Sequence, residues 1–514
     1  MKVSTKRIAS PGSTEKPDGD SLLGRIWRGP GVSNCPGLLD SLLPSPTHTA
    51  AMALGIDTHS PSDGSPSHGS PLLQDNRSLT SQVIRGSAWT LSGYALAQVL
   101  RLGSNIVLSR LLFPEAFGVM IIVNMVMQGL QMFSDVGINQ SIIQHKRGDD
   151  PIFMNTAWTI QVMRGIALCL VACLLAWPLS RWYGESSLSA IIPVVAISVA
   201  ISGFTSTKLM TLNRHMAFGR LTFLDLGTQV LSIAIMCIWA QFNPSPWALV
   251  AGGLSSSTLR MLLSQFLLPG PRNRFAWSAG TRAELMHFGR WIFFASALNF
   301  LASSGDRVLL AKYFSVSKLG IYGVAFMLAD AAAQVTSTLS HRVLFPAFGR
   351  VARTPGSDLS SAYYRVRGRW DLLVMPAIGL LISGGSVIVH ILYDSRYQEA
   401  GWMLQILAWR SVWLCLMVPG SVCLLALGKP QYATLELFIR CAWVLLGIPL
   451  ASNAAGDQGI VTVVGFAGLL SMPAIWWGLH RERVLNPRRE VLAPMYLCIG
   501  IGAGLLFRRM SGIQ

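Results

Sequence analysis

From Leu79 onward the chain alternates apolar segments of about 20 residues with short polar loops. A helix needs about 20 mostly apolar residues to cross a bilayer, and we predict thirteen such helices, near 88–109, 117–139, 155–179, 187–207, 222–242, 246–268, 288–312, 319–342, 369–392, 399–427, 432–452, 458–479 and 492–507. Only 13% of the residues are charged, about half the share in a soluble domain. The pattern therefore predicts an all-α polytopic membrane protein.

The beginning of the apolar region recurs 202 residues later without a gap. Six identities carry the match: Trp89, Ala95, Leu96, Gly103, Leu108 and Gly118 align with Trp291, Ala297, Leu298, Gly305, Leu310 and Gly320. Asn105 aligns with Arg307. Two related halves are common among transporters. We predict two six-helix lobes related by an internal repeat, followed by a short extra C-terminal helix.

Composition and loop lengths set the expected boundaries. Residues 1–78 are rich in Ser, Pro and Gly, as in HSPSDGSPSHGSPLLQDNRS, and this composition predicts a disordered tail. The basic loop PGPRNRFAWSAGTRA, beginning at Pro269, is the natural linker between the halves. We expect an N-terminal lobe at 79–268, a cytoplasmic linker at 269–285, a C-terminal lobe at 286–480, and a basic loop with the last helix at 481–514.

The formal net charge of +17 lies mostly in loops between apolar spans. Such charges are signals for topology, because cytoplasmic loops are enriched in Lys and Arg. With a cytoplasmic N-terminus, the inner loops hold 20 Lys and Arg residues and the outer loops hold 5. The charge therefore predicts orientation, and we expect no nucleic-acid partner.

The predicted first helix carries polar side chains at steps of three and four residues. They fall on one helical face: Tyr94, Gln98, Arg101, Asn105 and Ser109. An arginine at the bilayer centre costs about 2.5–3.5 kcal/mol even on the biological insertion scale. We therefore expect this stripe to face protein or a water-filled passage.

The second helix of each predicted half repeats this pattern. Its polar residues are Asn124, Gln128, Gln131, Asp135 and Asn139 in one half, and Asp330, Gln334, Ser337 and His341 in the other. Neutral residues at this spacing also join helices by hydrogen bonds. That alternative remains open for the neutral residues and is weaker for the charged ones.

Further arginines lie within or near the ends of predicted spans. Arg164 and Arg260 lie near helix middles, and we expect Arg410 to pair with a carboxylate from another helix. Guanidinium groups suit a phosphate or diphosphate, because their planar fork donates two hydrogen bonds and keeps its charge. The candidate cavity residues are Gln98, Arg101, Asn105, Asp135, Arg164, Arg260, Arg307 and Asp330.

Several kinds of chemistry are disfavoured. The sequence contains no GxxxxGK, HExxH, paired CxxC or GxSxG motif. Cys169 and Cys173 are four residues apart but have no His or carboxylate nearby, so we interpret them as packing residues. We expect no enzymatic activity, no metal and no cofactor.

Two runs of residues carry a resemblance to a known family: GSAWTLSGYALAQVLRLGSNIVLSRLLFPEAFGVM and DVGINQSIIQHKRGDDPIFMNTAWTIQVMRG. They resemble the start of the Wzx-type polysaccharide exporters, in the multidrug/oligosaccharidyl-lipid/polysaccharide flippase superfamily. The resemblance implies that the two lobes surround a central cavity that opens alternately to the two sides of the bacterial cytoplasmic (inner) membrane. It also implies that the cargo is undecaprenyl diphosphate carrying a short sugar repeat for exopolysaccharide, capsule or lipopolysaccharide. Membrane lipid, a polysaccharide polymerase and glycosyltransferases of the same pathway are the expected partners.

Other functions remain as alternatives. A lipid II flippase ranks second, since its cargo shares the diphosphate. A cation-coupled multidrug exporter needs acidic cavity residues, and here the predicted buried arginines equal or outnumber the carboxylates. A membrane glycosyltransferase or polymerase is a distant third class, because the chain lacks both an acidic sugar-nucleotide motif and a large outer loop.

The loop charges predict that positions 146, 214 and 353 are cytoplasmic, whereas 181 and 396 lie on the far side. Single cysteines at these positions, treated in whole cells with an impermeant thiol reagent, test the assignment. We expect labelling at 181 and 396 only. Labelling at 353 without labelling at 396 contradicts the predicted orientation.

Overall fold

The structure is a computed structural model of the 514-residue chain. It describes residues 92–512 apart from gaps at 135–136, 140–141, 143–146, 216–217, 283–295, 297–299, 302–303 and 355–357. The predicted tail and the candidate Asp135 lie outside the described residues. The described residues all belong to one compact unit.

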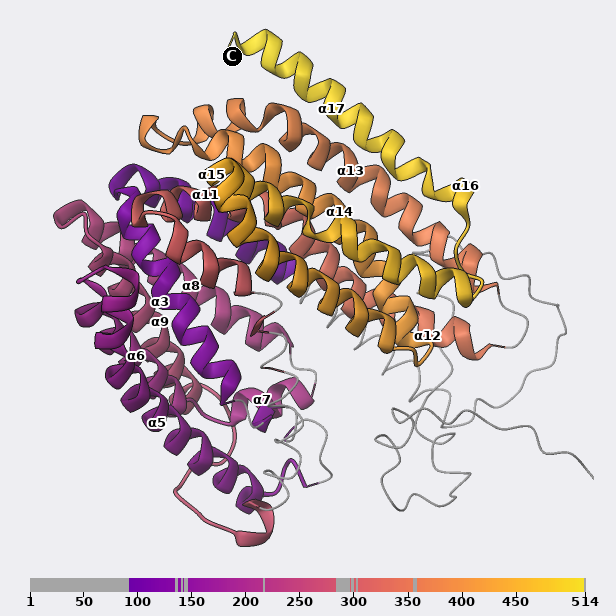
Figure 1. Ribbon diagram of the computed structural model, residues 1–514. Coiled ribbons are helices and arrows are strands. Elements are labelled where there is room, and N and C mark those ends of the chain that lie inside the picture. Colours follow the sequence, from indigo (N-terminus) through magenta and orange to yellow (C-terminus); the bar gives the residue numbers. More distant parts are fainter. Residues whose placement is uncertain are drawn as a thin grey trace, which may run out of the picture. The chain divides into compact units, whose positions relative to one another are not determined.

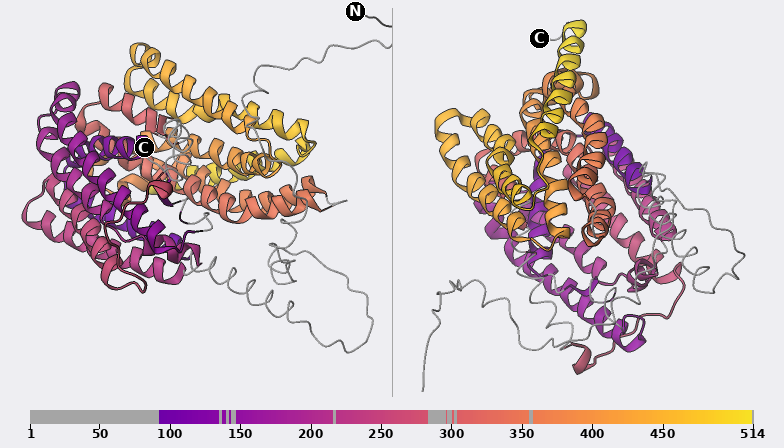
Figure 2. Two further views of the ribbon diagram at one scale, coloured as in Figure 1. Left: turned by 90° about the horizontal axis from the view of Figure 1, so that it is seen from below. Right: turned by 90° about the vertical axis from the view of Figure 1, so that its right-hand side faces the viewer.

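All regular structure in the described ranges is helical (Figure 1). The first bundle contains the helix at 92–111, α3 (Pro114–Phe133), α5 (Pro151–Tyr183), α6 (Leu188–Gly203), α7 (Lys208–Arg214), α8 (Phe218–Phe242) and α9 (Pro246–Phe266). The second contains the helix at 304–313, α11 (Val316–Leu339), α12 (Phe345–Arg353), α13 (Leu359–Leu392), α14 (Ala400–Ala426), α15 (Gln431–Arg481), α16 (Pro487–Glu490) and α17 (Leu492–Ser511). In the left view of Figure 2, most of the indigo-to-magenta helices of the first bundle lie on one side and the orange-to-yellow helices of the second on the other.

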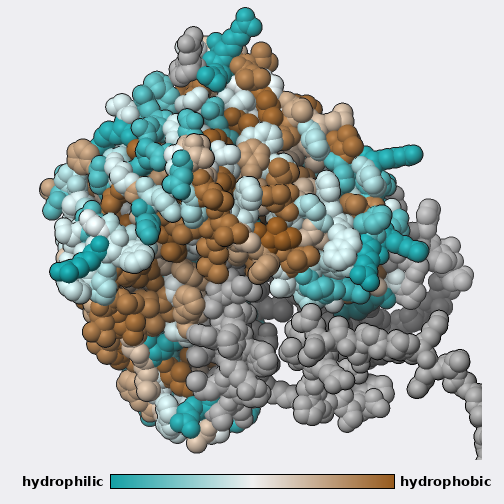
Figure 3. All heavy atoms as spheres, viewed as in Figure 1, coloured by the Kyte–Doolittle hydropathy of each residue, from teal (hydrophilic) through white to brown (hydrophobic). Residues whose placement is uncertain are grey.

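Length and apolar composition fit these helices to a bilayer. Among the described residues, eight helices are long and apolar enough to cross a membrane, or nine if the bent pair α6 and α7 forms one span. Large hydrophobic side chains remain exposed, such as Leu174 and Phe242, and Figure 3 shows hydrophobic residues over much of one face. Lipid is the environment in which such a surface is stable. The chain is a multi-pass membrane protein.

The helix boundaries confirm the internal repeat. α3 begins at Pro114 and α11 begins at Val316, which are 202 residues apart. The preceding helices end at 111 and 313, with the same separation. Local chemistry explains these starts: Pro114 occupies the first position of α3, where no amide donor is needed, and the Ser315 side chain accepts a hydrogen bond from the Lys318 amide.

Three predicted spans differ from the structure. The expected helix at 187–207 breaks after Gly203, and α6 and α7 meet at a 60° bend. The predicted helix at 319–342 corresponds to α11, which continues through a π-helical turn, Ser340–Leu344, into α12. α13 begins ten residues before the predicted 369, where Asp358 caps its first turn. The predicted bounds follow apolar residues only. They therefore miss the polar extensions of two helices and the break in the backbone after Gly203.

The predicted helices at 432–452 and 458–479 lie within α15. Gly456 interrupts its helical geometry with φ 55° and ψ −137°. This is a left-handed φ that glycine adopts without the steric cost of a Cβ. The turn therefore depends on glycine at this position.

The linker after α9 packs on the first bundle. The amides of Arg274 and Ala276 donate to the side chains of Asn155 (3.1 Å) and Thr159 (3.1 Å) on α5. The Phe275 ring lies 4.8 Å from that of Trp158. The first part of the linker is therefore docked along α5.

The two bundles meet where α3 and α11 begin. A Cβ built on Gly118 would lie 1.8 Å from the Val316 carbonyl oxygen, and one on Gly320 would lie 1.9 Å from the Pro114 carbonyl oxygen. Small residues allow backbones to approach this closely within a membrane. Gly118 and Gly320 are the repeat-related glycines found in the sequence, so the contact is nearly symmetric.

Side chains from the second bundle extend this contact along the first helix. Tyr393 donates to Asn105 Oδ1 (3.0 Å), and Tyr397 donates to the Leu112 carbonyl (3.2 Å). The Arg396 guanidinium donates to the carbonyls of Ser109 (3.3 Å) and Arg110 (3.2 Å). The polar stripe of the first helix therefore faces the other lobe instead of lipid.

The last helix, α17, has 20 residues, about 30 Å of helix, which is long enough to cross the membrane. It packs on α13, where Gly500 approaches Pro376 and Gly504 approaches Ser383 and Gly384.

A buried ion cluster joins α16, the short helix just before α17, to α13. Arg367, 2% exposed, donates to Glu490 Oε1 (2.6 Å) and Oε2 (2.8 Å), and to Asp371 Oδ2 (3.2 Å). Tyr364 also donates to Glu490 (2.6 Å). This cluster fixes the C-terminal segment to the second lobe.

Alanine at Gly118 or Gly320 should destabilise the protein by about 1–3 kcal/mol, because a methyl group would overlap a backbone carbonyl. Thermal unfolding of the purified protein in detergent measures the effect. Gly253→Ala is the matched control, since nothing lies within 4 Å of a Cβ built at that position. An unfolding midpoint for Gly118→Ala equal to that of the control would contradict the close-contact interpretation.

Glu490→Ala should destabilise the protein by about 3–5 kcal/mol, because it leaves a buried guanidinium without its main counter-charge. Loss of the contact should also make the segment after Arg483 more sensitive to protease. Glu482→Ala is the control, since its ion pair with Lys429 is long (3.6 Å) and partly exposed and should contribute less than about 1 kcal/mol. Equal unfolding midpoints for the two variants would show that the ion cluster of Arg367 and Glu490 does not stabilise the protein.

Candidate functional site

A pocket of about 300 Å³ lies between the two lobes, beside the glycine contact. We call it the inter-lobe pocket. The first lobe contributes Gln98, Arg101, Leu102, Ile121, Asn124, Met125 and Gln128, and the second contributes Arg307, Tyr322, Gly323, Phe326, Met327, Asp330, Ala331 and Gln334. Four predicted cavity residues therefore line one pocket: Gln98, Arg101, Arg307 and Asp330.

Arg101 and Arg307 enter this pocket from opposite lobes. No hydrogen bond or ion pair of either guanidinium occurs among residues 92–512 outside the gaps. Arg307 instead lies against an aromatic ring, with its Cζ 4.5 Å from the centroid of Phe326. Both arginines thus present positive charge that no described carboxylate neutralises.

The other charges of the pocket are paired. Arg410 of α14 forms an ion pair with Asp330 of α11, which confirms the expectation of a carboxylate partner from another helix. Gln334 donates to the second oxygen of Asp330 (2.8 Å). The Tyr322 hydroxyl is buried and has no hydrogen-bond partner within the described structure. The pocket therefore offers cationic and hydroxyl donors to a ligand.

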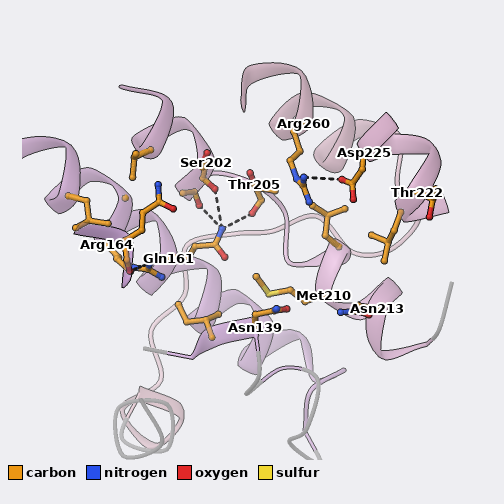
Figure 4. Close-up of a pocket in the computed structure, with 18 of the residues that line it drawn as sticks. Asn139, Gln161, Arg164, Ser202, Thr205, Met210, Asn213, Thr222, Asp225 and Arg260 are labelled. Atoms are coloured by element: carbon orange, nitrogen blue, oxygen red, sulfur yellow. Dashed lines mark hydrogen bonds and ion pairs between the residues drawn. The ribbon is translucent and has the colours of Figure 1, made fainter. Parts of the chain in front are cut away.

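A larger cavity of about 1100 Å³ lies within the first lobe. We call it the N-lobe chamber. Its lining is Gln131, Ile138, Asn139, Gln161, Arg164, Gly165, Leu168, Val199, Ser202, Gly203, Thr205, Leu209, Met210, Asn213, Leu221, Thr222, Asp225 and Arg260, with Arg342 and Val343 from the second lobe. In Figure 4, Arg164 and Gln161 lie on one side and Arg260, Asp225 and Thr222 on the other.

The predicted residues Arg164 and Arg260 lie in this chamber and are engaged by protein groups. Arg164 donates to Ser134 Oγ (3.0 Å) and to the Gln131 carbonyl (3.0 Å). Arg260 forms an ion pair with Asp225 Oδ1 at 2.9 Å (Figure 4). Both guanidinium groups therefore have protein partners, whereas those of Arg101 and Arg307 have none among the described residues.

The break between α6 and α7 forms part of the chamber wall. Gln161 Nε2 donates to the carbonyls of Gly203 (3.0 Å) and Thr205 (3.0 Å), and Gln265 donates to that of Phe204 (2.8 Å). Irregular backbone within a membrane is tolerated where protein groups or a cavity satisfy it. Gln161 therefore stabilises the break through its side-chain nitrogen, and its side-chain oxygen Oε1 can accept a hydrogen bond from a ligand.

The two cavities adjoin along α3. Asn124 and Gln128 line the inter-lobe pocket, and Gln131 lines the chamber. Gln128 and Gln131 differ by three residues, about 4.5 Å along the helix axis. Residues within one turn of α3 therefore line both cavities.

Two predicted cavity residues are elsewhere. Asn105 lies one turn beyond the inter-lobe pocket, where it accepts the hydrogen bond from Tyr393. Asp135 lies outside the described residues. The sequence interpretation did not select Asp225, Asn213, Tyr322 or Phe326, which all line a cavity. Phe326 and Tyr322 could not be told from ordinary core residues in the sequence. Asp225 was missed because it is not part of a row of polar residues at helical spacing.

A sequence model of the family described as "Polysaccharide biosynthesis protein" matches residues 107–401. The lipopolysaccharide biosynthesis protein WzxC of Escherichia coli (strain K12) is 22% identical over 336 residues, which cover 64% of this chain and 67% of WzxC. The teichuronic acid biosynthesis protein TuaB of Bacillus subtilis (strain 168) is 20% identical over 409 residues, covering 77% of this chain and 81% of TuaB.

Solved structures show the same fold. The lipid II flippase MurJ in an inward closed conformation matches with a TM-score of 0.62, at 12% identity, over 83% of this chain and 98% of that one. A multidrug resistance MATE family transporter of the MOP superfamily, in an inward-facing conformation, matches with a TM-score of 0.57, at 12% identity, over 76% and 94%. Both neighbours are two-lobed transporters.

Proposed function

We propose that this protein, which belongs to the family of polysaccharide biosynthesis proteins and is a flippase-type transporter, moves lipid-linked oligosaccharide repeat units across the bacterial cytoplasmic membrane. The cargo is an undecaprenyl diphosphate carrying a sugar repeat for surface polysaccharide. Glycosyltransferases that build the repeat and a polymerase that consumes it are the proposed pathway partners.

The observation that carries this proposal is the pair Arg101 and Arg307. They line one pocket from opposite lobes without a described counter-charge. Within a membrane, a guanidinium without a counter-charge is costly, and a diphosphate would offset that cost with charge-assisted, bidentate hydrogen bonds. The lipid tail would remain in the bilayer while the diphosphate and sugars cross.

The loop charges supply the proposed direction. In the predicted orientation, the glycine contact and the Arg396 hydrogen bonds close the outer end of the protein. Arg342, counted among the cytoplasmic loop charges, lines the chamber. Cargo would therefore enter from the cytoplasm, and its release would require separation of α3 from α11 at Gly118 and Gly320.

A drug exporter fits this site less well, because the Asp330 carboxylate is already paired with Arg410. A lipid II flippase shares the diphosphate, and the similarity to MurJ at 12% identity concerns the fold alone. The family match and the relatives named for polysaccharide pathways favour the oligosaccharide exporter.

Arg101→Ala and Arg307→Ala should each stop surface polysaccharide from appearing, while lipid-linked repeats accumulate in the inner leaflet. Arg→Lys should restore export only partly, since lysine keeps the charge but loses the planar fork. Quantifying surface polysaccharide and lipid-linked intermediates, at matched membrane levels of the protein, measures both effects.

Arg110→Ala is the matched control, because Arg110 lies on the same helix, is exposed and does not line the pocket. It should export normally. Normal export by both pocket variants at native protein levels would show that transport does not need these arginines, and the diphosphate pocket would be rejected.

A further inference from the structure

We infer that the N-lobe chamber is the compartment that binds the sugars of the cargo, and that Asn139, Asn213, Asp225 and Arg260 are specificity-determining residues. This inference rests on the proposed function and extends it. The inter-lobe pocket would hold the diphosphate, and the repeat unit would extend from it into the first lobe.

The size of the chamber fits an oligosaccharide. Its volume of about 1100 Å³ is at or above the upper end of the roughly 300–1,000 Å³ found for small-molecule sites. The inter-lobe pocket, at about 300 Å³, is at the lower end. A single diphosphate does not fill both cavities, but a diphosphate followed by several sugars is long enough to reach from one into the other.

The chemistry of the chamber fits hydroxyl groups. The side-chain amides of Asn139 and Asn213 line it, and neither has a hydrogen-bond partner in the part of the chain that is described. An amide offers both donors and an acceptor, which matches a sugar hydroxyl that also donates and accepts. These groups are hydrated when the chamber is empty and available when a ligand enters.

The Asp225–Arg260 pair adds directional contacts without adding net charge. It joins Arg260 to Oδ1 of Asp225, and both side chains are about half exposed (50% and 46%). Asp225 Oδ2 has no hydrogen bond among the described residues and can accept from a hydroxyl. The remaining guanidinium donors of Arg260 can bond to a neighbouring hydroxyl on the same sugar.

The contrast with the inter-lobe pocket separates the two roles. There, Arg101 and Arg307 have no carboxylate partner within the described ranges, which favours an anion. In the chamber, Asp225 neutralises Arg260, and protein oxygens already engage Arg164. The chamber therefore combines groups that bind hydroxyls with the positive charge of Arg164 and Arg342, which suits an oligosaccharide, whether neutral or acidic.

Binding of two lipids to the purified full-length protein in detergent tests this assignment. The first probe is undecaprenyl diphosphate, and the second is the lipid-linked oligosaccharide extracted from membranes of the source organism. Both have the same tail and diphosphate, so the ratio of their Kd values reports the contribution of the sugars. Wild type should bind the glycosylated lipid about tenfold or more tightly, since several hydrogen bonds are added.

The double variants Asn139→Ala/Asn213→Ala and Asp225→Asn/Arg260→Gln should bring this ratio close to one while leaving the Kd for undecaprenyl diphosphate unchanged. That unchanged Kd also shows that the variants fold. Asn453→Ala, an exposed asparagine on α15 outside both cavities, is the matched control and should keep the wild-type ratio.

The outcomes separate this inference from the proposed function. A ratio near one in wild type, or a wild-type ratio in both double variants, overturns the sugar compartment. If undecaprenyl diphosphate fails to bind wild type, or binds Arg101→Ala/Arg307→Ala equally well, the diphosphate pocket fails instead. In that case the glycosylated lipid still tests the chamber, and it should bind the chamber variants about tenfold more weakly.

Discussion

The close backbone contact between α3 and α11 determines how the polar side chains of both lobes are used. Gly118 and Gly320 allow each helix to touch a carbonyl of the other, and polar residues of both α3 and α11 line the inter-lobe pocket. Lipid does not compensate for the loss of water around Arg101 or Asn124. The contact therefore converts two otherwise unfavourable helix faces into an enclosed polar space, and both cavities border on it.

Six arginines on the helices divide into two groups by their partners. Arg260, Arg367 and Arg410 each have a carboxylate within ion-pair distance, and Arg164 is held by a hydroxyl and a carbonyl. These interactions hold elements together. Arg101 and Arg307 differ, since neither guanidinium has a hydrogen bond or an ion pair within the described structure. The distinction between structural and ligand-directed arginine depends on partners far apart in the sequence.

Periodicity and repetition predicted much of the architecture. The 202-residue shift anticipated helices that begin at Pro114 and Val316, and the three-four spacing placed Gln98 and Arg101 on one face. The sequence did not predict the break after Gly203, because Gln161 and Gln265 stabilise it from other helices. Nor did it predict that Asp225 meets Arg260. Pairings between residues this far apart in the chain leave no periodic trace, so the chamber emerged only from tertiary structure.

The docked linker has a mechanical consequence. Since Arg274 and Ala276 are hydrogen-bonded to Asn155 and Thr159 of α5, the linker is held to the first lobe as far as Ala276. Thr159 lies two residues from Gln161, the side chain that secures the broken helix. One turn of α5 therefore holds both the linker and the break between α6 and α7, so a displacement of the linker would act on the same helix segment that forms part of the chamber wall.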